Sequence, residues 1–183
     1  IERGVIRLTD GVYSLSERVS ARADDLNSLL ALKTDFIVRL HARGGEFFEN
    51  YLVTLLSKYY ERHGMRVLEA YVTGGSADGG IDGVIKTVDP LGFRETVMIQ
   101  TKNRIDLTSE TDVRGFYGAV CAKQGSRGIF VTASDFHSTA KAFLDKVDNC
   151  IGINGERLFS LAIECSYGIK KASGSLSVDE RVI

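Results

Sequence analysis

The sequence has few cysteines, no excess of positive charge and no long apolar run, and each absence excludes a class of protein. Its 183 residues include three cysteines, Cys121, Cys150 and Cys165, an odd number at wide spacing. This pattern fits neither a zinc site nor the disulfide framework of a small secreted domain, so we expect buried free thiols in a reducing compartment, the cytoplasm. No run approaches ~18 apolar residues, so no membrane span is expected.

The charge of the chain is balanced. Lys and Arg number 23 against 24 Asp and Glu, which gives a formal net charge of −1 at pH 7. A protein that binds nucleic acid wholly through electrostatic attraction carries a basic excess, so that class is disfavoured. Any contact with DNA has to come from a local basic patch.

The composition predicts one main domain with additions at both ends. Hydrophobic residues make up 44% of the chain, enough for one good core. We expect an N-terminal appendage over residues 1–43, a main domain over 44–169 and an exposed tail over 170–183, where Ser, Gly, Lys and acidic residues dominate. The chain starts at Ile1 rather than Met, and we expect it to be a fragment of a longer protein.

The spacing of apolar residues predicts an α/β order of elements. Spacings of three and four indicate amphipathic helices, and short runs of Val and Ile bounded by turn residues indicate strands. Helices are expected at residues 16–40, 45–63, 113–121, 138–147 and 156–167, and strands at 5–8, 12–15, 65–73, 81–88, 94–102, 128–132 and 150–153. The apolar stripe of the first helix either packs on the main domain or serves dimerisation.

Two neighbouring strands, 81–88 and 94–102, carry the polar residues of most interest. The turn between them makes them antiparallel neighbours, and alternation places Gln100 and Lys102 on one face of the sheet. If Val88 pairs with Arg94, partner numbers sum to 182 and Asp82 lies opposite Gln100, within about 5 Å. A slip of one residue would place the two side chains on opposite faces.

An acid, an amide oxygen and a lysine on one face form a set suited to phosphodiester hydrolysis. A carboxylate and an amide oxygen are ligands that a hard divalent cation prefers. An ammonium group can neutralise a phosphate oxygen and orient or help deprotonate an attacking water. The sequence therefore predicts metal-dependent hydrolytic chemistry at this site.

The order of these residues resembles a known family. Asp78-Gly79-Gly80-Ile81-Asp82-Gly83 followed by Gln100-Thr101-Lys102 is similar to the Asp…(Glu/Gln)-x-Lys active site of the PD-(D/E)xK nuclease superfamily, and most similar to the Mrr-like restriction endonuclease catalytic domain. The resemblance covers residues 44 to 167 and implies an α/β fold with a mixed β-sheet flanked by helices, the restriction-endonuclease-like αβββαβ core. It implies an endodeoxyribonuclease that needs Mg²⁺ or Mn²⁺.

The resemblance also assigns roles. Asp82 and Gln100, with the Thr101 carbonyl as a further candidate, would hold the metal ion, and Lys102 would activate water and offset phosphate charge. Gln100 is neutral where many relatives of the superfamily have Glu, which weakens the attraction for a cation by one charge. Mrr-like members commonly have Gln here, so we interpret the change as a subfamily trait.

Glu49 is the predicted acid from the helix at 45–63. It lies near the buried side of that helix, where a carboxylate is costly unless it meets a cation or hydrogen-bond donors. The pair Phe48-Glu49 matches a Phe-Glu pair that supplies an acid in the Mrr-like family. An acid that reaches solvent at the edge of the stripe is the other interpretation, and Glu46 is the second candidate for the role.

Arg104 and Ser134 are the candidates for contact with DNA. Ser134 precedes a helix start whose hydroxyl and N–H groups could hold a phosphate, or could simply cap the helix. Asp78 is expected to stabilise a turn, with assistance at the metal as the alternative. A Ser134-Asp135-His137 triad is disfavoured, because triad members come from separate elements.

Partners and alternatives follow from the same resemblance. The expected partner is double-stranded DNA, and cutting both strands favours a homodimer.

The hairpin at residues 5–15 looks like the wing of a winged-helix domain, although any two short strands around Asp10-Gly11 look alike. The alternatives are a non-catalytic DNA-binding module on a degenerate nuclease fold, in which Lys102 would form an ion pair with Asp82, and a repair or junction-resolving nuclease.

Overall fold

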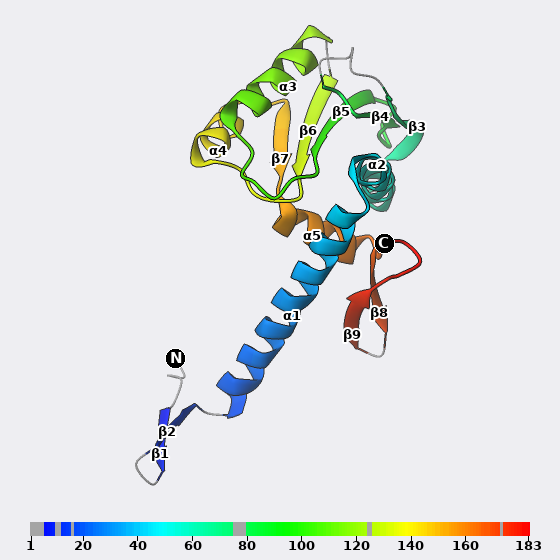
Figure 1. Cartoon of the computed structure of the whole chain (residues 1–183). Coiled ribbons are helices and arrows are strands. Elements are labelled where there is room, and N and C mark those ends of the chain that lie inside the picture. The colour runs from blue at the N-terminus through cyan, green and yellow to red at the C-terminus, as the bar shows by residue number, and fades with distance from the viewer. Residues whose placement is uncertain (1–5, 10–11, 16, 75–79, 124–125, 173) are drawn as a thin grey trace.

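A five-stranded mixed sheet lies at the centre of the protein (Figure 1). The computed structural model describes residues 6–9, 12–15, 17–74, 80–123, 126–172 and 174–183. The sheet has the order β3-β4-β5-β6-β7, with an antiparallel meander over β3 to β5 and parallel pairing from β5 through β7. Its strands are β3 (Arg66–Val72), β4 (Gly83–Val88), β5 (Arg94–Lys102), β6 (Ser126–Thr132) and β7 (Cys150–Ile153).

Helices cover both faces of this sheet, as Figure 1 shows. One face packs against α1 (Glu17–Ala42), α2 (Gly45–Arg62) and α5 (Gly155–Glu164), and the other against α3 (Glu110–Ala122) and α4 (Ser138–Leu144). Along β5, Val97 and Ile99 face the first layer and Met98 the second, all three buried. This is why the central strands are apolar on both sides. The predicted α/β fold with a mixed, helix-flanked sheet is confirmed.

The register between β4 and β5 is the predicted one. Val88 pairs with Arg94 and Gly83 with Ile99, so partner numbers sum to 182 throughout this ladder. A backbone bond from the Gly92 N–H to the Asp89 carbonyl, 3.0 Å, closes the turn. Alternation along β5 therefore places Gln100 and Lys102 on the face of Met98.

The N-terminal elements also match the expected order. Strands β1 (Ile6–Thr9) and β2 (Val12–Leu15) pair as an antiparallel hairpin ahead of α1. The C-terminal half of α1 enters the core through Phe36 and Leu40, both fully buried. The expected caps and turns at Asp10-Gly11 and Ser16 lie outside the described residues. A winged-helix wing stays a prediction.

From Lys170 onward most of the described residues are exposed, as expected, but the segment is not a loose tail. Strands β8 (Ile169–Ala172) and β9 (Ser175–Val178) form a hairpin, and Val178 and Ile183 are buried in the core. The Asp179 N–H donates to the Gly168 carbonyl at 2.9 Å and fixes the segment against the domain. Leu176 and Val178 alternate with Ser175 and Ser177, a short strand pattern that the composition of the segment does not show.

The cysteines are free, but only Cys150 is buried; Cys165 is half-buried and Cys121 exposed. The expectation of buried thiols therefore holds for one of the three. Among the described helices, none is long and apolar enough to cross a membrane.

Candidate active site

Asp82 lies where β4 begins, next to the end of β5. Its N–H donates to the Ile99 carbonyl at 2.8 Å, and its own carbonyl accepts from the Thr73 N–H at 3.0 Å. The carboxylate Oδ2 accepts from the Thr101 N–H at 2.6 Å and from the Thr101 hydroxyl at 3.1 Å. The hydrogen-bond partner of Asp82 is thus Thr101, not Gln100. Within the described residues, the second carboxylate oxygen, Oδ1, has no hydrogen-bond partner.

Gln100 is buried, and its amide oxygen has no partner. The side chain is 9% exposed, and Oε1 meets no hydrogen-bond donor in the part of the chain that the structure describes. The amide lies against Gly80, where an added Cβ would come within 2.4 Å of the Gln100 Nε2 atom. Gly80 also has φ +84°, a conformation that glycine adopts without strain. A glycine here lets the Gln100 amide approach the backbone.

Lys102 is the last residue of β5 and is half-buried. It pairs with Thr132 of β6, and its carbonyl accepts from the Ala133 N–H at 3.2 Å. Within the described residues, no carboxylate lies within 4.0 Å of the Lys102 ammonium group, and the Asp82 carboxylate is also farther away than this. The ion pair expected of a degenerate site is therefore not formed between the two.

Glu49 approaches the same site from α2. It is half-buried between buried Phe48 and Leu52 on that helix. Burial raises the pKa of its carboxyl group, and the negative charges of Asp82 and Glu46 raise this pKa further. Glu49 and Asp82 are therefore close enough to interact electrostatically. Glu46, the second candidate, is exposed in the first turn of α2.

This pKa shift predicts a pH-dependent stability difference. Because the folded-state pKa of Glu49 is raised, the native state holds its proton more tightly, and ionisation opposes folding as pH rises from about 4 toward neutrality. We expect Glu49→Gln to have a larger free energy of unfolding than the wild type at neutral pH in EDTA. The difference should vanish below about pH 4, where both side chains are neutral. Urea denaturation across this range measures it.

Glu61→Gln is the matched control, since Glu61 is an exposed residue of the same helix. It should change stability little at any pH. A Glu49→Gln variant no more stable than the wild type at neutral pH would contradict the raised pKa of Glu49.

These residues suit a hard divalent cation. Within the described residues, Asp82 offers a carboxylate oxygen without a hydrogen-bond partner, Gln100 a buried amide oxygen without one, and Glu49 a second carboxylate nearby. Oxygen ligands of this kind are those that Mg²⁺ and Mn²⁺ take. No cluster of three or more His, Cys, Asp or Glu able to hold a metal ion occurs in the described ranges. An amide and main-chain oxygens would have to complete the ligand set.

The two residues predicted to contact DNA line one hollow beside Lys102. Arg104 and Ser134 share this hollow, of about 380 Å³, which also borders the end of α1. Arg104 forms an ion pair with Asp112, and the Ser134 hydroxyl donates to the Asp106 carbonyl at 3.0 Å. Both side chains therefore hold the segment between β5 and α3. Contact with DNA stays a prediction for both, and Asp78 lies outside the described residues.

Sequence patterns missed one contact at this site, between His41 in the last turn of α1 and Asn103, the residue after Lys102. His41 Nδ1 and Asn103 Oδ1 are 2.8 Å apart, and Asn103 Nδ2 donates to the His41 carbonyl at 3.1 Å. The partners are 62 residues apart on different elements. Periodicity within one element cannot show such a pair.

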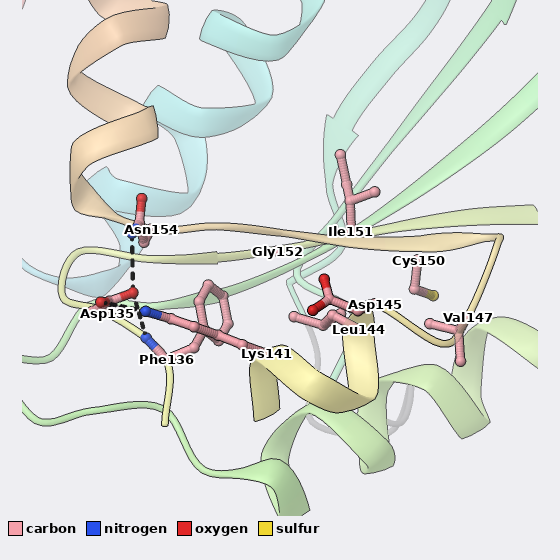
Figure 2. A pocket seen from close by; sticks show the side chains of 10 residues that line it. All are labelled: Asp135, Phe136, Lys141, Leu144, Asp145, Val147, Cys150, Ile151, Gly152 and Asn154. Carbon is pink, nitrogen blue, oxygen red and sulfur yellow. Dashed lines mark hydrogen bonds and ion pairs between the residues drawn. The ribbon is translucent and has the colours of Figure 1, made fainter. Parts of the chain in front are cut away.

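A second hollow, of about 480 Å³, lies between α4 and β7 (Figure 2). Asp135 forms an ion pair with Lys141 at 2.8 Å and accepts from the Asn154 amide at 3.0 Å, so the polar groups here satisfy one another. Its lining includes none of the four predicted catalytic residues. Ser134 and Asp135 both have other partners than His137, which agrees with the rejection of a triad.

Two sequence similarities indicate the family of this chain. A family model for a restriction endonuclease, the Mrr catalytic domain, matches residues 41–162. The type IV methyl-directed restriction enzyme EcoKMrr of Escherichia coli strain K12 is 41% identical over 96 residues, which is 52% of this chain and 31% of that enzyme. The chain thus spans about a third of the length of this relative.

Two solved structures share the fold. The MspJI restriction endonuclease, in complex with a 27-mer oligonucleotide, aligns with TM-score 0.56 and 22% identity over 73% of this chain and 30% of its own. The DNA modification-dependent restriction endonuclease AspBHI aligns with TM-score 0.57 and 18% identity over 72% and 35%. With the family model matching well over half of its length, the chain belongs to the Mrr-like restriction endonucleases of the PD-(D/E)xK fold.

Proposed function

We propose that this domain is a metal-dependent endonuclease that hydrolyses phosphodiester bonds of double-stranded DNA. The observation that carries the proposal is the buried Gln100 amide oxygen, which has no hydrogen-bond partner in the described residues although it neighbours the Asp82–Thr101 contact. A buried polar atom without a partner costs about 1–3 kcal/mol, so its retention points to a ligand that the site receives.

Each residue then has a distinct task. Asp82 and Gln100 would hold Mg²⁺ or Mn²⁺, with the Thr101 carbonyl as a further oxygen and Glu49 orienting water or contributing to a second ion. The bound ion would supply Lewis acidity and offset negative charge on the phosphate. The Lys102 ammonium would contact the scissile phosphate and help orient and deprotonate the attacking water. Its lack of a carboxylate partner among the described residues leaves it available for this contact.

The biological role that fits best is restriction of foreign DNA. The names of EcoKMrr and AspBHI, methyl-directed and modification-dependent, make modified DNA the substrate class to test first. Cleavage of both strands requires two active sites, so we propose a homodimer, acting in the cytoplasm. A non-catalytic DNA-binding module is the second candidate, but the Asp82–Lys102 ion pair that would favour it is not formed.

Supercoiled plasmid, methylated and unmethylated, tests the activity and its metal dependence. We expect nicked or linear product with Mg²⁺, no product in EDTA, and recovery when Mg²⁺ is added in excess over EDTA. Linear product formed without accumulation of the nicked form would support paired active sites.

Cleavage that persists in EDTA would contradict the metal dependence. A gel shift of the plasmid without cleavage, by this chain and by a longer protein that contains it, would favour the binding module. Branched or damaged duplexes cut faster than intact plasmid would favour a repair or junction-resolving nuclease.

A further inference from the structure

We propose that His41 and Asn103 are positioning residues for Lys102, and that this side-chain pair connects helix α1 to the active site. The proposal rests on the proposed nuclease function, since it assigns to the pair an effect on the chemistry at Lys102. It concerns a contact that neither the motif nor the comparisons identify.

The two hydrogen bonds fix the orientation of both side chains. The His41 carbonyl can only accept, so the Asn103 group 3.1 Å from it is the NH₂, and the amide oxygen then faces His41 Nδ1 at 2.8 Å. Nδ1 must therefore carry a proton and donate to Asn103. The His41 carbonyl also accepts from the Gly44 N–H at 3.2 Å, so the Asn103 NH₂ is a second donor to this oxygen.

At Lys102 the backbone is held on the β6 side by the bond from the Ala133 N–H, and the Asn103 amide adds a connection to α1. The β5–β6 ladder ends at the pair Lys102–Thr132, and the segment beyond it leaves the sheet. Lysine has a long, flexible side chain, so the position of its ammonium group depends on how firmly its backbone is held. Asn103 is the next residue, and its amide joins that backbone to α1.

Apolar packing between α1 and this segment is incomplete. A hollow of about 380 Å³ separates them, with Val38 58% exposed on one side and Ile105 80% exposed on the other. Few apolar contacts therefore hold the segment against the helix, and the His41–Asn103 bonds provide the specific connection.

Helix α1 is suited to transmit a displacement. Its C-terminal half is anchored by Phe36 and Leu40 in the core, whereas Leu26 and Leu30 are 67% and 55% exposed. From this half the helix runs out of the domain toward the hairpin β1–β2 (Figure 1). A change in the orientation of α1 would reach the active site at His41, and through Asn103 it would reach Lys102.

Two substitutions at His41 separate positioning from mere packing. His41→Asn keeps an N–H donor where Nδ1 lies, whereas His41→Gln places its donor farther out and loses the bond to Asn103. We expect kcat for plasmid cleavage to fall about 10-fold or more in His41→Gln and Asn103→Ala, with KM for DNA within about 2-fold, because misplaced catalytic groups lower kcat. His41→Asn should keep most of the wild-type kcat. Arg39→Ala, which removes exposed ion pairs of the same helix to Asp35 and Glu180, is the control and should cleave as the wild type does.

The double variant His41→Gln/Asn103→Ala adds a test of the pair. Its kcat should fall little below that of Asn103→Ala alone, since both changes break one connection. Losses that multiply, equal losses in His41→Asn and His41→Gln, or unchanged kcat in Asn103→Ala would overturn the proposal.

Hydrogen exchange provides a readout that does not need cleavage. Peptides that cover residues 99–106 should exchange faster in Asn103→Ala and His41→Gln than in the wild type and in Arg39→Ala, while peptides of α3 stay unchanged. Unchanged exchange at 99–106 would overturn the positioning role. If the wild type cut no DNA but the exchange result held, the nuclease function would fail while the connection from α1 to the Lys102 segment stood.

Discussion

Replacing Lys102 with alanine is expected to lower the rate of plasmid cleavage by about 10³-fold, or about 4 kcal/mol of transition-state stabilisation. The ammonium group has no carboxylate partner within 4.0 Å among the described residues, and it shares the strand and face of Gln100. Its removal would take a positive charge from the place where, in the proposed mechanism, charge develops on the phosphate. Because no ion pair is lost, the free energy of unfolding should change by less than about 1 kcal/mol.

Two further variants make this result specific. Lys102→Met keeps the apolar stem and should be as inactive as Lys102→Ala, which would assign the loss to the charge. Lys86→Ala removes a lysine of the adjacent strand β4 that pairs with Glu69 at the surface, and it should cleave at the wild-type rate. A cleavage rate of Lys102→Ala within about 10-fold of the wild-type rate would contradict the proposed role of Lys102, because general acid–base or electrostatic catalysis contributes more than this.

The parts of the fold that follow from local pattern could be predicted. The Val88–Arg94 register of β4 and β5 was assumed from the short turn between the strands, and the structure has that register. Both faces of these strands are buried, so burial alone could not have excluded a slip of one residue. Helical spacing placed Glu49 near the buried side of its helix, and the family resemblance of Phe48-Glu49 assigned it to the site; the raised pKa of its carboxyl group agrees with that position. In each case the residues that support the prediction lie within one helix or within two strands that are adjacent in the sequence.

The parts that depend on distant contacts could not be predicted. The Asp82 carboxylate bonds to Thr101, because Asp82 lies just before β4 and its N–H reaches the Ile99 carbonyl out of step with the ladder. Ideal sheet geometry had placed it opposite Gln100. The C-terminal hairpin is held by single buried residues such as Ile183, and a sequence shows neither these nor the His41–Asn103 pair.

Gly80 lies in the chain just before Asp82 and contacts the Gln100 side chain. Its residue type is set by two requirements, a positive φ of 84° and the approach of the Gln100 amide. Several other described glycines have a positive φ but no atom near an added Cβ. Gly92, in the turn between β4 and β5, has φ +97° and no atom within 4 Å of an added Cβ. The two glycines therefore form a matched pair in which only the contact with Gln100 differs.

Gly80→Ala is expected to lower the cleavage rate by about 10²-fold, because the added methyl group would force the Gln100 amide out of its place and disturb the metal ligands. The Mg²⁺ concentration for half-maximal cleavage should rise as well. Gly92→Ala should cleave normally. Both substitutions should cost about 1–2 kcal/mol of stability from backbone strain, measured by urea denaturation.

The comparison of the two variants isolates Gln100. An equal loss of stability with a loss of activity confined to Gly80→Ala would assign the loss to the displaced amide rather than to strain. If instead Gly80→Ala cut DNA as fast as Gly92→Ala at every Mg²⁺ concentration, the position of Gln100 would not matter. The unpartnered amide oxygen could then no longer support the assignment of Gln100 as a metal ligand.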